Sequence, residues 1–555
     1  MGCCGSSPVV VSEALGLKER PRTVPVTVWR PSLSAPYPEA FLVSSNKTKD
    51  LAVAFSGGGM RSAVLCLGWM QALEEMGISI TRDVRYVSTI SGSTWTLAPM
   101  LYRPSNEGPG VFLGDGCEPE FLTLEKCDEL CAGGHSRVLT ESNFIANLAQ
   151  EGLTNVPLSG LGLTKAGDGV DYWSAAVGTS FFVPNGILCH LNSSTPAVDS
   201  GKAAQCAHAL DGLATEIYPA RASSVPFLIM NASILVGGAQ GCVPLEFTPM
   251  YSGTPVAFQN LDSVFVEPEG FCATSVAKAD LPQTKGSISV TVSRVVSIHE
   301  MSGISSSNLA QTRGDEMTAE AYEKANFPCI QCFSNGLQRL VDGGSTDNTG
   351  IIALLRRGCR NVLAGLACNL SVALDSVVDA NIHSLGTLAG LFGRQKSELG
   401  EVDSVKDDDF NRQRVVFPAD KWEELLAGLR SRLQAGQGLV HKLALPVLPN
   451  AQIGVAGGYT LQLVITISGE CSSFVARLPE AVRSQIKADA EAASQGGSGV
   501  GGRLQAVGLL ESDLSIFPYP PVGHLKYSPA LLGLMSQQAR WTLLQSKGDV
   551  LSLVA

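Results

Sequence analysis

The pattern of apolar and polar positions predicts a strand followed by a helix near the start of the folded chain. Residues 51–55 (LAVAF) are apolar throughout, which is typical of a strand buried on both faces. Apolar residues then recur at helical spacing from Leu65 to Met76. Gly77 follows and predicts the C-terminal end of that helix, since glycine adopts the left-handed conformation of a helix cap.

Further apolar runs predict a sheet built from strands that alternate with helices. The predicted strands are residues 84–90, 225–230, 288–298, 337–341 and 361–367. A helical pattern at 350–358 separates the last two, and a strand–helix–strand order predicts parallel pairing. The predicted fold class is α/β, with a wound, mainly parallel central sheet, helices on both faces and large lid or cap insertions.

The distribution of proline and glycine divides the chain. Five prolines discourage regular structure in residues 1–45, which are predicted to be a tail and linker. Residues 46–545 are predicted to form one large folded unit with insertions at about 101–220 and 376–440, and residues 546–555 a C-terminal end. Within the large unit, the glycine-rich stretch 494–502 (SQGGSGVGG) predicts a mobile loop.

Charge and hydropathy exclude two classes of protein. The formal net charge of −11 argues against nucleic acid as a main partner, because binding phosphates requires an excess of lysine and arginine. No apolar run approaches the eighteen or so residues of a membrane-spanning helix. We therefore expect a soluble chain unless something anchors it to a membrane. The sequence does not indicate an oligomeric state.

The fifteen cysteines are scattered and odd in number, which favours a reducing compartment over a disulfide framework. Cys329 and Cys332 have the spacing of a metal or redox pair, but a zinc knuckle would need a second matched pair. A second grouping contains Cys117, Cys127 and Cys131 with His135. Both groupings are interpreted as buried or incidental thiols, with metal binding as the alternative, so neither a metal nor another cofactor is predicted.

The N-terminus, MGCCGSS, matches the pattern for lipid attachment. Gly2 is the predicted myristoylation site once Met1 is removed, and Cys3 and Cys4 are predicted palmitoylation sites. The alternative is an unmodified, flexible start. Because stable anchoring takes two lipid signals, dual acylation would place the protein on the cytoplasmic face of a membrane, and without it the protein would be cytosolic. A phospholipid membrane is thus a predicted partner.

Three consecutive glycines lie between the first predicted strand and its helix, in the stretch SGGGMRSA. This stretch fits neither the GxGxxG turn of dinucleotide-binding folds nor a Walker loop. What remains is a turn whose backbone N–H groups are exposed next to the positive end of a helix. We therefore predict that Gly58 and Gly59 donate to an oxyanion and that Arg61 holds an anionic group such as a phosphate.

An oxyanion site implies a nucleophile, and Ser91 is the candidate. It lies between the strand 84–90 and a small-residue turn, the position of a serine at a strand-to-helix elbow, although Thr89 and Ser93 replace the usual glycines. Asp342 ends a later apolar strand and precedes two glycines, so its carboxylate is predicted to reach a serine at a neighbouring strand end. Taken separately, each stretch also fits an ordinary turn.

The order of glycine loop, serine elbow and Asp-Gly-Gly resembles the catalytic domain of the cytosolic phospholipase A2 family, a patatin-related lineage. The stretches 244–253 and 476–482 also resemble this family. The resemblance implies that Ser91 is the nucleophile, Asp342 the base, Gly58 and Gly59 the oxyanion hole, and Arg61 the cation on the phosphate side of the substrate.

The resemblance thereby implies a membrane-associated serine hydrolase that releases fatty acid from glycerophospholipids through a Ser-Asp dyad. Alternatives with the same dyad are a lysophospholipase or an acyltransferase. A different alternative is a lipid-binding scaffold on a catalytically decayed fold. Many relatives carry a C2 module before the catalytic domain, for which the residues preceding Leu51 are too few.

Overall fold

The computed structural model describes most of the chain. The described residues are 21–35, 37–44, 50–104, 108–142, 172–187, 194–197, 200–210, 216–219, 226–236, 241–258, 261–273, 276, 280–308, 329–333, 336–370, 388–394, 414–495 and 514–555. The predicted lipidation sites and residues 496–502 of the predicted mobile loop (494–502) lie outside these ranges, as do parts of both predicted insertions.

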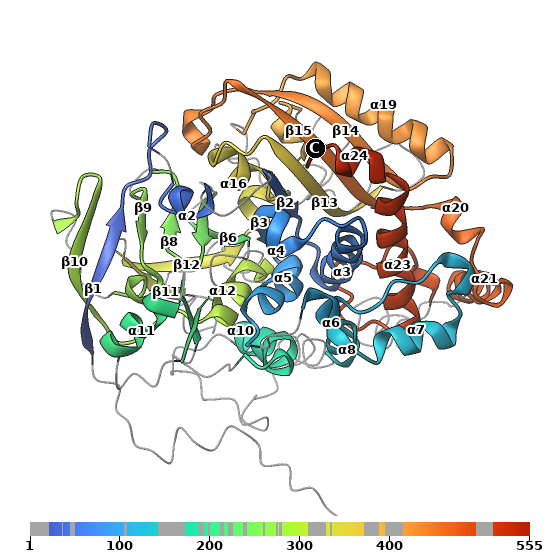
Figure 1. Cartoon of the computed structure of the whole chain (residues 1–555), viewed down its shortest axis with the longest axis horizontal. Coiled ribbons are helices and arrows are strands. Elements are labelled where there is room, and N and C mark those ends of the chain that lie inside the picture. Colours follow the sequence, from blue (N-terminus) through green and yellow to red (C-terminus); the bar gives the residue numbers. More distant parts are fainter. Residues whose placement is uncertain are drawn as a thin grey trace, which may run out of the picture.

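A 13-stranded sheet runs through the described chain in the order β10-β1-β9-β8-β7-β6-β3-β2-β13-β15-β14, with β12 beside β6 and β11 beside β12 (Figure 1). Its strands are β1 (Arg22–Trp29), β2 (Leu51–Phe55), β3 (Val84–Ile90), β6 (Phe227–Leu235), β7 (Cys242–Phe247), β8 (Ser252–Thr254), β9 (Val264–Val266), β10 (Lys285–Val292), β11 (Cys329–Cys332), β12 (Gly336–Asp342), β13 (Asn361–Leu370), β14 (Leu439–Val447) and β15 (Tyr459–Gly469). A separate parallel pair contains β4 (Ser194–Ala197) and β5 (Glu216–Pro219).

Helices surround this sheet. They are α2 (Ala40–Ser44), α3 (Gly59–Glu75), α4 (Ile80–Asp83), α5 (Gly92–Tyr102), α6 (Pro109–Leu113), α7 (Leu124–Cys131), α8 (Gly134–Glu141), α10 (Tyr172–Val177), α11 (Ser200–Ala209), α12 (Ile298–Ser305), α15 (Gly344–Asp347), α16 (Ile351–Arg356), α19 (Asp420–Gln434), α20 (Ser472–Val475), α21 (Glu480–Gln495), α23 (Pro529–Gln545) and α24 (Lys547–Leu551). None of the helices in the described part of the chain is long and apolar enough to span a membrane.

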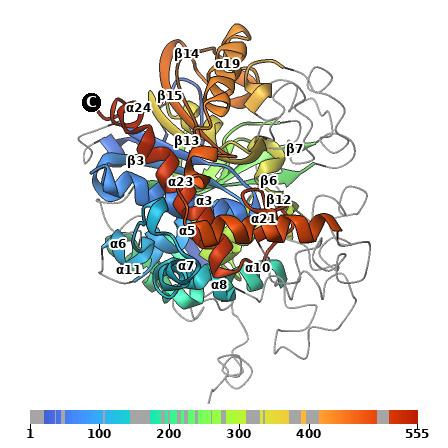
Figure 2. The same ribbon diagram turned by 90° about the vertical axis from the view of Figure 1, so that its right-hand side faces the viewer.

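Two hydrophobic cores lie on opposite faces of the sheet because successive side chains of a strand point to opposite sides. In β2, Val53 belongs to one core and its neighbours Ala52 and Ala54 to the other. Helices α3, α5 and α23 contribute to the first core, and α16 and α19 to the second. Figure 2 shows α23 crossing in front of α3, and α19 at the top beside β14. The predicted α/β class with helices on both faces is confirmed.

The parallel part of the sheet is its centre, where β6, β3, β2, β13 and β15 pair in parallel. The flanking strands pair antiparallel. The prediction that the strand at 337–341 runs parallel in the sheet is wrong, because β12 pairs antiparallel with the C-terminal half of β6. β3 ends beside Asn231, so it leaves the edge of β6 beyond this residue unpaired. β12, which runs in the opposite direction, pairs with that part of the edge.

Most predicted elements are confirmed, including β2, α3, β3, β6, β13 and α16. The strand predicted at 288–298 is wrong at its end, because β10 stops at Val292 and α12 starts at Ile298. Ser297 caps α12: its hydroxyl accepts from the Glu300 N–H, and the Glu300 carboxylate accepts from the Ser297 N–H. That S-x-x-E spacing was the signal for a helix start.

The prediction that prolines leave residues 1–45 without regular structure is wrong for β1 and α2. Val24, Val26 and Val28 alternate with exposed or partly exposed residues and are buried, which is the pattern of a strand with one buried face. Only Val28 and Trp29 pair with a second strand, β9. Pro25 therefore has a partner strand on one side only, where a missing N–H is tolerated.

Candidate active site

Ser91 and Asp342 come together because two strands end head-on against β6. β3 runs parallel to β6 and ends with Ile90 beside Asn231, while β12 runs the other way and ends with Asp342 beside Ala232. Asn231 and Ala232 are adjacent, about 3.3 Å apart along the strand. A straight continuation of β3 would place Ser91 where Asp342 already lies, so the chain has to turn sharply at Ser91.

The turn at Ser91 has a strained backbone. Its dihedral angles are φ 52° and ψ −128°, and it is the one residue other than glycine with positive φ in the described ranges. Such a conformation costs about 1–3 kcal/mol and persists only where the surroundings impose it. Helix α5 starts at the next residue, Gly92. The arrangement of strand, strained serine and helix is that of a nucleophile elbow.

The Asp342 carboxylate lies close enough to the Ser91 side chain for the hydroxyl to act on its pKa, and it accepts a hydrogen bond from the Gly344 N–H at 2.7 Å. Burial disfavours its charged form and raises its pKa from the ordinary value of 3.8 to about 7, although the Gly344 N–H and the Ser91 side chain act in the opposite direction. Asp342 is 5% exposed and Ser91 8% exposed. A carboxyl group that titrates near neutrality and contacts a serine hydroxyl is suited to exchange a proton with it.

The glycine loop packs directly on this elbow. A Cβ atom on Gly57 would lie 3.0 Å from the Ser91 Cβ, and a Cβ atom on Gly92 would overlap the Gly59 carbonyl oxygen. Gly58 has φ 147° and Gly59 φ 59°, so both need the conformational freedom of glycine. Their N–H groups precede or start α3 and have no acceptor among the described residues. Two glycine N–H groups without a described acceptor thus lie in the loop that packs on the Ser91 elbow.

Arg61 lies in the first turn of α3 and is 2% exposed. Its Nη1 donates to the Pro520 carbonyl oxygen at 2.8 Å. A Cβ atom on Gly59 would lie 2.9 Å from the Val522 carbonyl oxygen, so the segment that contains Pro520 also covers the glycine loop. The structure thus places Arg61 beside the loop, in contact with this covering segment.

Two residues that take the place of the usual elbow glycines make hydrogen bonds of their own. The Thr89 hydroxyl donates to the Ile229 carbonyl in β6 at 3.1 Å. The Ser93 hydroxyl accepts from the Ile90 N–H at 2.7 Å and contacts the Phe55 carbonyl at 3.1 Å. Both side chains are buried and help to hold the ends of β2, β3 and β6 in place.

Sequence reasoning missed Asn348, which joins the two loops of the site. Its Oδ1 accepts from the Gly57 N–H at 3.0 Å, and it would lie 2.8 Å from a Cβ atom on Gly344. Asp347 stabilises the same turn by accepting from the N–H groups of Thr349 at 2.8 Å and Ile352 at 3.0 Å. The run of small polar residues after Asp-Gly-Gly was the available signal, since such side chains bond to nearby backbone groups.

The sequence comparisons find similarity to one group of enzymes. No family model matches it. A segment of 64 residues is 34% identical to mouse cytosolic phospholipase A2 gamma, and it makes up 12% of this chain and 10% of the mouse protein. The chain resembles the cytosolic phospholipases A2. This match confirms the resemblance predicted from the motifs.

Solved structures of one such enzyme match as well. Human GIVD cytosolic phospholipase A2 has a TM-score of 0.47 and 16% identity over 91% of this chain and 60% of the human chain. The same enzyme in complex with methyl gamma-linolenyl fluorophosphonate has a TM-score of 0.43 and 15% identity over 94% of this chain and 64% of the human chain. This chain therefore spans about three-fifths of the length of the solved structures that it matches.

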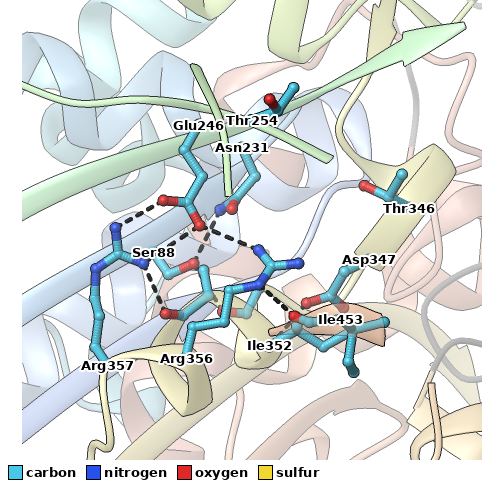
Figure 3. A network of polar contacts seen from close by, with 12 residues as sticks. Ser88, Asn231, Glu246, Thr254, Thr346, Asp347, Ile352, Arg356, Arg357 and Ile453 are labelled. Atoms are coloured by element: carbon cyan, nitrogen blue, oxygen red, sulfur yellow. Dashed lines mark hydrogen bonds and ion pairs between the residues drawn. The ribbon is translucent and has the colours of Figure 1, made fainter. Parts of the chain in front are cut away.

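A buried charge cluster lies among residues of the second core (Figure 3). Arg357 pairs with Glu246 at 2.7 Å and with Glu39 at 2.7 Å, and Arg356 pairs with Glu246 at 3.1 Å. All four side chains are at most 3% exposed. The two arginines lower the pKa of Glu246 although burial acts to raise it, so the carboxylate stays ionised. The cluster joins the start of α2 and strand β7 to the end of α16.

Cys117, Cys127 and Cys131 are buried free thiols, as interpreted from the sequence. Burial raises the pKa of Cys127 and Cys131 to about 12. His135 stacks on Phe112, and burial lowers its pKa to about 3. In the described ranges, no three His, Cys, Asp or Glu residues are grouped so that they could hold a metal ion.

Proposed function

We propose that the chain is a serine acyl hydrolase that cleaves a fatty-acyl ester of a glycerophospholipid. The observation that carries the proposal is the juxtaposition of Ser91, in its strained elbow, and the buried carboxylate of Asp342, whose pKa is raised to about 7. The glycine loop packed on the elbow and the resemblance to the cytosolic phospholipases A2 support it.

In the proposed first step, the Ser91 Oγ attacks the ester carbonyl carbon and its proton passes to Asp342. The carbonyl oxygen becomes an oxyanion that accepts hydrogen bonds from Gly58 and Gly59 N–H. When this intermediate collapses, the ester C–O bond breaks and the Asp342 proton passes to the leaving oxygen. An acyl-serine and a lysophospholipid result.

In the second step, Asp342 takes a proton from water, which attacks the acyl-serine carbonyl. The second oxyanion rests on the same two N–H groups, and Ser91 regains its proton as the fatty acid leaves. Arg61 is proposed as the cation on the phosphate side of the substrate, where its charge adds to the positive end of α3. The proposal requires no metal or organic cofactor.

Residence at a membrane is a further part of the proposal. Myristoylation of Gly2 gives only marginal, reversible binding, with an association constant near ~10⁴ M⁻¹. Palmitoylation of Cys3 or Cys4 would supply the second signal. The exposed side chains of Phe41, Val111 and Phe121 give the folded part some apolar surface of its own.

The test is hydrolysis of phospholipid vesicles by the purified chain, compared with Ser91→Ala and Ser142→Ala. Ser142 is a matched control, because it is also a buried serine and its hydroxyl donates to the Leu139 carbonyl in another helix. We expect Ser91→Ala to lower turnover by at least ~10³-fold, since a two-residue mechanism has no substitute for its nucleophile. Ser142→Ala should retain activity.

A fluorophosphonate probe separates the possible outcomes. Labelling at Ser91 together with fatty-acid release supports the whole proposal. Labelling without phospholipid cleavage would support the dyad and indicate a different reaction. That reaction would be hydrolysis of a lysophospholipid or a neutral lipid, or transfer of the acyl group to another acceptor. Neither labelling nor hydrolysis would favour the lipid-binding scaffold and overturn the assignment of Ser91.

A further inference from the structure

Helix α12 reaches the site from a segment in which the sequence suggested no functional residue. It starts at the Ser297 cap and ends at Ser305, which is fully buried. The helix packs against β6, β12 and α5, which all border the site. Its C-terminal residue therefore lies between the turn that follows β3 and the turn that follows β12.

Ser305 bonds to both turns at once. Its hydroxyl accepts from the Ser91 N–H at 3.0 Å and donates to the Asn231 carbonyl at 2.6 Å. Its own carbonyl accepts from the Gly343 N–H at 3.1 Å. Gly343 follows Asp342 directly, so one residue bonds to Ser91 itself and to the neighbour of Asp342.

Neighbouring side chains hold α12 in this position. The Ser302 and Thr94 hydroxyls lie 2.7 Å apart, and the Thr94 hydroxyl donates to the Ser91 carbonyl at 2.6 Å. The Ser306 hydroxyl accepts from the indole N–H of Trp95 at 3.1 Å and of Trp173 at 3.0 Å. Ser305 is thus fixed relative to α5 by contacts on either side of it.

We infer that Ser305 is a positioning residue that holds the backbone of Ser91 in its strained conformation and in register with the Asp342 turn. The inference rests on the proposed function and goes beyond its assigned residues. A strained residue keeps its geometry only if its surroundings impose it, and a buried N–H without an acceptor is costly. The Ser305 hydroxyl supplies that acceptor.

The decisive comparison is Ser305→Ala against Ser307→Ala. Ser307 is buried two residues later, and its hydroxyl donates to the Ile304 carbonyl at 2.8 Å. Both substitutions remove one hydroxyl from the same end of α12. Only the first removes the acceptor of the Ser91 N–H, so a general loosening of the helix end is common to both variants.

The measurement is the rate of fluorophosphonate labelling at Ser91, resolved into the maximal rate and the probe concentration for half-maximal rate. We expect Ser305→Ala to lower the maximal rate by roughly 10- to 100-fold with little change in the half-maximal concentration, because positioning affects the reactive geometry rather than probe binding. Ser307→Ala should label like the wild type. Hydrogen exchange followed by mass spectrometry should show faster exchange in the peptide containing Ser91 for Ser305→Ala only.

Each other outcome overturns a specific statement. Equal labelling rates for Ser305→Ala and the wild type would overturn the positioning role alone. Slower labelling that is accompanied by faster hydrogen exchange throughout the chain would show that Ser305 stabilises the fold in general and does not specifically position Ser91. A wild-type chain that is not labelled at Ser91 would overturn the proposed function, and the positioning role with it.

Discussion

Replacing Asp342 by asparagine should stabilise the folded chain, and the gain should grow with pH. The folded-state pKa of Asp342 is raised from 3.8 to about 7, so between these values the folded chain retains a proton that the unfolded chain has lost. Stability therefore falls as pH rises through this window. A shift of about three pH units corresponds to about 4 kcal/mol at pH 8 and above. Asparagine is neutral throughout and does not have this penalty.

The assay is urea unfolding of the wild type and of Asp342→Asn at pH 5.5, 7 and 8.5. Because all other titrating groups are shared, the difference in free energy of unfolding isolates Asp342. From the two pKa values, this difference should rise by about 2 kcal/mol between pH 5.5 and 8.5 and then level off. A difference that stays flat across this range would refute the idea that burial dominates the carboxyl group. The variant should also lose labelling at Ser91, since an amide cannot accept the proton.

Three further predictions concern the glycine contact, the buried charges and the N-terminus. Gly92→Ala should lower labelling at Ser91 by at least ~100-fold, because the added methyl overlaps a glycine-loop carbonyl, whereas Gly108→Ala, with open space around it, should not. In urea unfolding, Arg357→Met should destabilise the chain by about 3–5 kcal/mol, because it leaves two buried glutamates without this partner. The control Arg137→Met, which breaks an exposed pair with Glu141, should destabilise it by under about 1 kcal/mol. Gly2→Ala should shift the protein from the membrane fraction to the soluble fraction of cells, and unchanged membrane association would show that the tail is not the anchor.

The centre of the fold could be predicted from the sequence because its signals are local. Strands β2 and β3 match their predicted ranges, and α3 ends just before the predicted glycine cap, although it starts at Gly59, before the predicted helical spacing at Leu65. The positions of Ser91 and Asp342 at strand ends depend on the same signals. Each of these features is contained in fewer than about twenty consecutive residues.

The remaining features depend on contacts that the local pattern does not contain. The direction of β12 is set by the free edge of β6, more than a hundred residues earlier in the chain. The partnership of Ser305 with Ser91 spans 214 residues, and that of Asn348 with Gly57 spans 291. A serine or asparagine in a polar run carries no mark of such a partner, since these residues are common in ordinary turns.

The head-on meeting of β3 and β12 also gives a physical reason why the proposed mechanism needs no histidine. In a Ser-His-Asp triad, an imidazole ring lies between the serine and the carboxylate. It takes the serine proton and passes it to the leaving group, while the carboxylate orients the ring. Here the two strand ends lie beside the adjacent residues Asn231 and Ala232, so the Ser91 and Asp342 side chains lie close together with no imidazole between them. An aspartate with an ordinary pKa would be a weak base toward a serine hydroxyl. Burial raises the pKa of Asp342 to about 7 and brings it to the range in which histidine acts as a base. The strand geometry therefore supplies the contact and burial supplies the basicity, which are the two contributions that an imidazole makes in a triad.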